Sequence, residues 1–156
     1  MAVLSFFEWL ERTDVATIIR RSPYLIGILS SVHLLGLTLI GGSGIVSCLR
    51  CLGFLPEQPL SEIMRPAGNG VVLGFALTLA SGFFLFAARA SSAVQDPAFQ
   101  VKMALVLAAA VFHFTVYRTV TRRDETRPSL LPLTGILGLT LWLGVAFAGF
   151  AFEVFN

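Results

Sequence analysis

Long apolar runs between charged residues constrain this chain more than any other feature of its sequence. Three of them, residues 22–49, 66–88 and 128–152, contain no Asp, Glu, Lys or Arg. A helix needs about 20 apolar residues to cross the hydrocarbon core of a bilayer, so each run is long enough for one span. The sequence therefore predicts a membrane protein built from helices.

A fourth run, residues 97–120, carries Lys102 near one end and Arg118 near the other. The strictly uncharged part, Met103 to Tyr117, would be about 23 Å long as a helix. Both cations must then extend outward to the interface or face a protein interior. We count four spans, and we treat residues 1–156 as a single membrane domain.

Helix-start signals and short connections set the predicted topology. Ser22-Pro23 and Asp96-Pro97 each place a capping side chain before a proline at the first helical position. Short connections make consecutive spans antiparallel, which predicts an all-α, up-down-up-down four-helix bundle. Residues 3–20 contain interfacial aromatic side chains and predict one or two short helices on the membrane surface, broken near Thr13-Asp14. Residues 53–65 and 90–96 are read as polar linkers.

The distribution of cations gives a direction to the bundle. Five cations fall on the face that carries the termini and six on the opposite face. The cluster from Arg118 to Arg127 is compact and close to a span end, which favours that face as cytoplasmic and places the termini on the non-cytoplasmic side. The net charge of +2 is explained by membrane anchoring, and no nucleic-acid motif is present.

The chain has two histidines, and both lie inside predicted spans. An imidazole in hydrocarbon is costly and is retained mostly where it binds something, so this pair is the main functional signal. At 100° per residue each histidine shares its helix face with small residues, which permit close helix packing or leave room for a flat cofactor. The candidate cofactor-binding residues are His33, Gly36, Gly44, Lys102, Ala109, His113 and Tyr117.

The histidines predict a haem b site, with His33 and His113 as candidate metal ligands. Lys102 lies eleven residues before His113, about 16 Å along the helix, where it could pair with a propionate. The depths of the two histidines differ by roughly 9 Å, so several arrangements stay open. In the first, both imidazoles bind one iron. In the second, one imidazole binds the iron, and the sixth ligand is Met103 or absent. In the third, the two histidines have separate roles. The structural alternative is that each imidazole bonds a hydroxyl or carbonyl across the bundle.

Other chemistry has little support in the sequence. Cys48-Leu49-Arg50-Cys51 has C-x-x-C spacing, but no second cysteine pair and no adjoining histidine completes a zinc or c-type haem motif. We interpret both thiols as small residues at a span end. No acidic residue lies in the middle of a span, and no nucleophile, base and orienting group occur together. We therefore predict no reaction catalysed by this chain alone.

Four short stretches carry a resemblance to a known family: residues 6–11, 31–36, 96–102 and 112–113. They resemble an uncharacterised family of small bacterial four-helix inner-membrane proteins, itself broadly similar to four-helix b-type cytochromes and copper-resistance membrane domains. The resemblance implies a multi-pass protein of the bacterial inner membrane. Members often carry an arginine after a glycine in the last span, and here the matching position is Phe150 after Gly149.

Three functions follow as hypotheses. The first is a haem b subunit that relays electrons between the quinone pool and a partner protein, with Lys102 and arginines near the propionates. The second is a cofactor-free scaffold or accessory subunit in a membrane complex. The third is a quinone or lipid site in which a histidine and Tyr117 form hydrogen bonds. The expected partners are membrane lipids, quinone, and a membrane redox complex or further copies of the chain.

Overall fold

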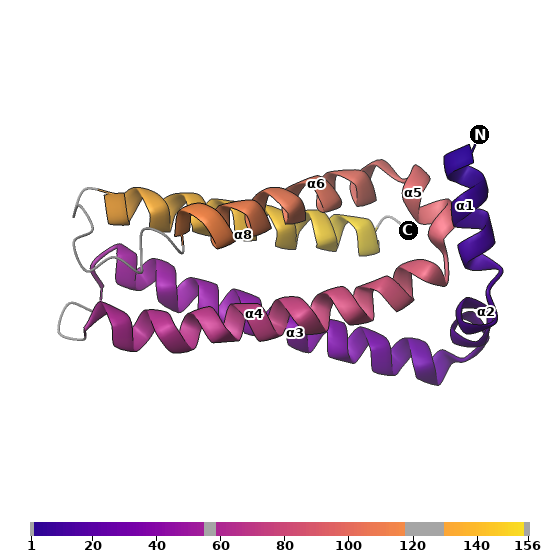
Figure 1. The fold of residues 1–156 in the computed structure, drawn as a ribbon, viewed down its shortest axis with the longest axis horizontal. Helices are drawn as coiled ribbons and strands as arrows, with labels where there is room; N and C mark the ends of the chain where they lie inside the picture. Colours follow the sequence, from indigo (N-terminus) through magenta and orange to yellow (C-terminus); the bar gives the residue numbers. More distant parts are fainter. Residues whose placement is uncertain (1, 55–58, 118–129, 155–156) are drawn as a thin grey trace.

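The computed structural model describes residues 2–54, 59–117 and 130–154, and these residues are helical with short connections (Figure 1). The elements in chain order are α1 (Ala2–Glu11), α2 (Asp14–Arg21), α3 (Pro23–Cys51), α4 (Leu60–Ala87), α5 (Ala90–Gln95), α6 (Pro97–Phe112), the π-helix η1 (His113–Tyr117) and α8 (Leu130–Val154). No strand occurs in the described ranges, and the predicted all-α class is confirmed.

Four helical segments are long and apolar enough to cross a membrane: Pro23–Cys51, Ser61–Ala87, Pro97–Thr115 and Leu130–Phe150. They match the four predicted spans and run side by side as a bundle (Figure 1). The prediction of a multi-pass helical membrane protein is therefore confirmed. The predicted C-terminal end of the third span, residues 118–120, and the Arg118–Arg127 cluster lie outside the described residues.

The bundle consists of two helix pairs. α3 packs along α4, α6 packs along α8, and the pairs meet where α3 contacts α8. Figure 1 shows the α3–α4 pair below the α6–α8 pair. Within the described residues no Cα atoms of α3 and α6 approach within 8 Å of each other, although Phe112 of α6 packs against the cluster of Cys51 and Met64 at the end of α3. The two spans that carry the histidines are therefore diagonal to each other.

The α3–α4 crossing depends on two glycines. A Cβ atom placed on Gly36 would lie 2.8 Å from the carbonyl oxygen of Gly74, and one placed on Gly74 would lie 2.6 Å from the carbonyl oxygen of Gly36. Small residues let two backbones approach this closely. Gly36 therefore faces α4 at this crossing, and its role beside a cofactor stays a prediction.

The two predicted helix caps are present. Ser22 Oγ accepts a hydrogen bond from the backbone N–H of Leu25 at 3.4 Å. Asp96 Oδ1 accepts from the N–H groups of Ala98 at 2.7 Å and Phe99 at 3.1 Å. These bonds satisfy N–H groups that the first turn leaves without helical partners, which fixes where α3 and α6 begin.

The surface helices break where the sequence indicated. α1 ends at Glu11 and α2 begins at Asp14, with Thr13 as its N-cap. Thr13 Oγ1 accepts a hydrogen bond from the N–H of Ala16 at 3.4 Å. The predicted interfacial segment is therefore two short helices joined by one capped turn.

Two connections differ from the prediction. α4 begins at Leu60 instead of Pro66, so the proline lies inside the helix. The additional turns bury Ile63 and Met64. Pro66 has no N–H, so the carbonyl of Glu62 has no helical hydrogen-bond donor, and Glu62 is an exposed residue. The second difference is that part of the predicted linker 90–96 forms α5, in which Ala90 and Ala93 are buried.

Candidate functional site

His33 lies on α3 with one edge of its ring against α4. Its Nδ1 atom is 3.1 Å from Ser81 Oγ. A Cβ atom on Gly82 would lie 2.9 Å from His33 Cε1. The imidazole therefore rests on the α4 backbone at Gly82, and the absence of a side chain there makes room for it.

The hydrogen bonds of Ser81 assign the tautomer of His33. Ser81 Oγ is 2.6 Å from the carbonyl oxygen of Leu77, to which it donates its hydroxyl proton. A serine hydroxyl has one proton, so Ser81 acts as the acceptor toward His33. In the neutral imidazole, Nδ1 then carries the proton and Nε2 carries a lone pair. That lone pair can coordinate a metal or accept a hydrogen bond.

His113 lies at the point where α6 changes into a π-helix. Its side chain is buried, and its ring packs edge to face on that of Phe114, with 5.3 Å between the ring centroids. Its backbone N–H bonds to the carbonyls of Ala109 and Ala110. Short π-helical segments are rare in proteins, and those that occur often lie at functional sites. The sequence analysis used the geometry of a regular α-helix for residues 97–120, whereas the structure has a π-helix from His113 to Tyr117. The side chain of Tyr117 lies outside the described residues.

The two histidines occupy different levels of the bundle. Phe112, next to His113, packs near Gly138 of α8, where a Cβ atom would lie 3.3 Å from Phe112 Cε1 and 3.6 Å from Cys48 Sγ. Cys48 is fifteen residues beyond His33, about 22 Å along α3. Because α3 and α6 are also diagonal and His33 faces α4, ligation of a single iron by both imidazoles does not fit.

The remaining candidate residues contact α8 or are buried within α6. Lys102 is half-buried, and its Cε atom would lie 3.8 Å from a Cβ atom on Gly149. Trp142 Cδ1 would lie 3.7 Å from a Cβ atom on Gly44, so the indole ring covers this glycine. Ala109 is fully buried. These positions pack α8 onto the bundle, and only Lys102 adds a charge.

Both cysteines are free thiols buried at the C-terminal end of α3. α8 covers them at Gly135 and Gly138, and Met64 of α4 forms a hydrophobic cluster with Cys51. Within the described ranges, no three His, Cys, Asp or Glu side chains are placed to hold a metal ion. The arrangement is that of small packing residues, in agreement with the sequence interpretation.

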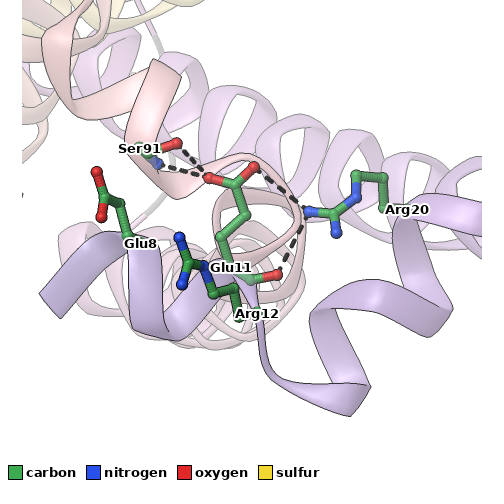
Figure 2. A pocket seen from close by; sticks show the side chains of 5 residues that line it. All are labelled: Glu8, Glu11, Arg12, Arg20 and Ser91. Atoms are coloured by element: carbon green, nitrogen blue, oxygen red, sulfur yellow. Dashed lines mark hydrogen bonds and ion pairs between the residues drawn. The ribbon is translucent and has the colours of Figure 1, made fainter. Parts of the chain in front are cut away.

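A polar pocket at the other end of α3 has no counterpart in the sequence analysis. It has a volume of about 270 Å³ and lies between α1, α2 and α5 (Figure 2). The lining residues are Glu8, Glu11, Arg12, Arg20 and Ser91. The one sequence signal was the four-residue spacing of Glu8 and Arg12, which in a helical turn brings two side chains close together; in the structure this turn extends α1 by one residue, with the Arg12 N–H bonded to the Glu8 carbonyl at 3.2 Å.

Glu11 holds the walls of this pocket together. Its Oε2 atom accepts hydrogen bonds from the backbone N–H of Ser91 at 3.0 Å and from the Ser91 hydroxyl. Its Oε1 atom is 3.3 Å from Arg20 Nη1 (Figure 2). Arg20 Nη1 also donates to the Ala88 carbonyl at 3.2 Å. The Ser91 hydroxyl, with the Ser91 N–H and Arg20, lowers the pKa of Glu11 despite its burial.

Comparison with known proteins places the chain in a family. Residues 6–154 match the model of DUF6644, a family of unknown function. The chain belongs to the DUF6644 family. This agrees with the resemblance to an uncharacterised family, although no link to cytochromes is found. No curated protein and no solved structure matches the chain.

The DUF6644 chain thus contains two separate polar features. One is the imidazole of His33, oriented by Ser81 within the spans. The other is the charged pocket formed by α1, α2 and α5 at the end of the bundle. The first can supply a nitrogen ligand, and the second can supply hydrogen bonds to charged groups.

Proposed function

We propose that this protein is a haem b-binding subunit of the bacterial inner membrane that relays electrons between the quinone pool and a partner protein. The observation that carries the proposal is the hydrogen bond from His33 Nδ1 to Ser81 Oγ. Histidines that bind metals almost always donate their other ring N–H to a fixed acceptor, which sets the tautomer and raises the basicity of the ligand. His33 has this arrangement.

The residues fit a haem held by one histidine. His33 would supply the axial nitrogen through Nε2, and Ser81 would hold the imidazole ring through Nδ1. Gly82 leaves the space that the His33 imidazole occupies. The bound haem would supply a one-electron redox centre. Lys102 remains the candidate partner for a propionate, whereas Arg20 is already bonded to Glu11 and Ala88. His113 is not part of this ligand set.

The location within the cell forms part of the proposal. The resemblance to an uncharacterised family of small bacterial four-helix inner-membrane proteins supports the bacterial inner membrane. The compact cation cluster of the third connection supports a cytoplasmic position for that loop and a non-cytoplasmic position for the termini.

The test is an ultraviolet–visible spectrum of the protein purified in mild detergent after expression with added haem, recorded oxidised and after dithionite reduction. We expect a Soret band and reduced bands of a b-type haem in the wild type, and their loss in His33→Ala. Gly82→Ala retains the imidazole but places a methyl group 2.9 Å from its Cε1 atom, so the spectrum should change. A featureless wild-type spectrum, with no haem bound on titration, would refute the proposal.

A matched pair of serine variants tests the role of Ser81. Ser81 and Ser31 each donate to the carbonyl four residues earlier, at 2.6 Å and 2.8 Å, but Ser31 is exposed and Ser81 contacts His33. Ser81→Ala removes the acceptor for Nδ1, which lowers the basicity of the ligand and should raise the haem reduction potential. Ser31→Ala should leave the potential unchanged. Equal potentials for both variants would contradict the proposed role of Ser81.

A second candidate is a cofactor-free accessory subunit. In the most apolar window of each span, 11–22% of the residues are buried within the chain. The spans therefore present most of their surface to lipids, to other membrane helices or to further copies of the chain. If this candidate is correct, His33→Ala and His113→Ala alter assembly on native gels and no variant or wild-type sample binds haem.

Quinone binding would use the same atom of His33. A neutral imidazole with a lone pair on Nε2 can accept a hydrogen bond from a quinol hydroxyl. Extraction of the purified protein for quinone separates this alternative, because tight quinone would then be present in the wild type and lost in His33→Ala without any haem spectrum.

A further inference from the structure

We infer that the pocket lined by Glu8, Glu11, Arg12, Arg20 and Ser91 binds a phosphoethanolamine group, which combines a phosphate anion with a primary ammonium. This inference is independent of the proposed haem function.

The pocket lies where a lipid headgroup would be. α1, α2 and α5 gather at the end of the bundle at which α3 begins and α4 ends (Figure 1). On α1 the aromatic side chains of Phe6 and Trp9 are 54% and 61% exposed. Amphipathic helices with exposed aromatic residues lie in the interfacial plane of a membrane. The pocket therefore opens at the level of the phosphate and amine groups of the bilayer.

Two of the charged groups hold the pocket in shape. Glu11 binds Ser91 through one oxygen and Arg20 through the other, so α1 is joined to α5 and to α2. Arg20 also donates to the carbonyl of Ala88, next to the end of α4. These contacts fix the walls before any ligand is present, which lowers the ordering cost of binding.

Two other charged groups are available to a ligand. Glu8 lies on α1, Arg12 directly follows the last residue of that helix, and both line the pocket (Figure 2). At this pocket Arg20 forms an ion pair with Glu11 within 4.0 Å, whereas no ion pair joins Glu8 to Arg12. They present an acceptor and a donor of opposite charge to the same space.

The balance of charge selects the class of ligand. Two carboxylates and two guanidinium groups give the lining no net charge, so a simple anion meets Glu8 and Glu11 and a simple cation meets Arg12 and Arg20. A zwitterion satisfies both signs. The guanidinium of Arg12 can bind phosphate oxygens in bidentate fashion, and Glu8 can accept the N–H donors of a primary ammonium.

The volume of the pocket and the need for an N–H donor to Glu8 narrow the class of ligand further. A volume of about 270 Å³ is close to the lower limit for small-molecule sites, which suits a headgroup. A quaternary ammonium has no N–H to donate to Glu8, so phosphocholine should bind less well. The phosphoethanolamine group can come from phosphatidylethanolamine in the bilayer or from a soluble molecule, and the experiment separates these sources.

The experiment uses the full chain in mild detergent with Trp142→Phe, so that fluorescence reports Trp9, which adjoins Glu8. The titrants are short-chain phosphatidylethanolamine, phosphatidylcholine and phosphatidylglycerol, together with free phosphoethanolamine. We expect saturable binding of phosphatidylethanolamine, about 10–150-fold tighter than the other two lipids, because one charge-assisted hydrogen bond contributes about 1.5–3 kcal/mol. Equally tight binding of free phosphoethanolamine would identify a soluble source of the same group.

Variants localise the binding. Glu8→Gln and Arg12→Gln change exposed side chains and should each weaken phosphatidylethanolamine binding about tenfold. Arg21→Gln, an exposed arginine of α2 that does not line the pocket, is the control and should bind as the parent does. Equal affinity for the three lipids in the parent protein would overturn the inference whatever the variants do. Unchanged affinity in both pocket variants would also overturn it.

Discussion

The α3–α4 crossing allows a quantitative test with one methyl group. Gly36→Ala places a Cβ atom 2.8 Å from the carbonyl oxygen of Gly74 and 2.9 Å from the backbone nitrogen of Thr78. Ordinary contacts begin near 3.4 Å, so the helices must separate by about 0.6 Å or deform. Overpacking of this kind typically costs about 1–3 kcal/mol. We therefore expect Gly36→Ala to destabilise the bundle.

Gly42→Ala is the matched control on the same helix. No atom lies within 4 Å of a Cβ at Gly42, so the variant gains only the higher helix propensity of alanine, about 0.5–1 kcal/mol. Gly36→Ala gains the same propensity term. The difference between the two variants therefore isolates the steric cost at the crossing, about 1–3 kcal/mol.

The chain contains its own reporter of unfolding. Cys48 and Cys51 are free thiols with 3% and 4% of their surface exposed, so a maleimide dye reacts only when the bundle opens. Under conditions in which closing is faster than labelling, the labelling rate follows the opening equilibrium. We expect Gly36→Ala to label about 5–150-fold faster than Gly42→Ala in mild detergent, the ratio that corresponds to about 1–3 kcal/mol. Equal labelling rates would refute the assignment of the crossing.

Three further outcomes follow from single contacts. Ser91 and Arg20 hold the pKa of Glu11 below its usual 4.5, so this carboxylate contributes its full stabilisation above about pH 4.5 and loses it as the pH falls through the lowered pKa. Trp9 fluorescence in Trp142→Phe should therefore report release of α1 on acidification. Glu11→Gln should remove that transition, and an identical transition in the variant would contradict the prediction. Pro66→Ala restores an N–H for the Glu62 carbonyl, which should stabilise the bundle by up to about 3 kcal/mol and thereby slow thiol labelling. Faster labelling would show that the proline does not strain α4. Asp96→Ala removes two N-cap hydrogen bonds and should destabilise by about 1 kcal/mol in the same assay, with Asp96→Asn as the conservative control, and an unchanged rate would rule out this capping role.

Local chemistry made the spans and their starts predictable. The number of spans follows from the length of uncharged apolar sequence that a bilayer requires, and all four were found. The starts of α3 and α6 follow from Ser22-Pro23 and Asp96-Pro97, because a cap bonds only to N–H groups of its own first turn. Both properties depend on neighbours in the sequence.

The facing surfaces of the spans were beyond the sequence. A membrane span is apolar on all sides, so no periodic pattern marks the face that meets another helix. Gly36 and Gly74 are two of fourteen glycines in the chain, and only the packing of α3 on α4 brings these two together. The same packing turned His33 toward Ser81 and separated it from His113.

The sequence by itself determined that this chain is a four-span helical membrane protein with two histidines inside its spans, because those properties depend on composition along the chain. The tertiary structure decided the start of α4 before Pro66, the π-helix at His113, and the charged pocket at the end of the bundle. The pocket depends on contacts between segments far apart in the chain. Glu11 and Ser91, which are eighty residues apart, meet only because α1 and α5 lie at the same end of the bundle.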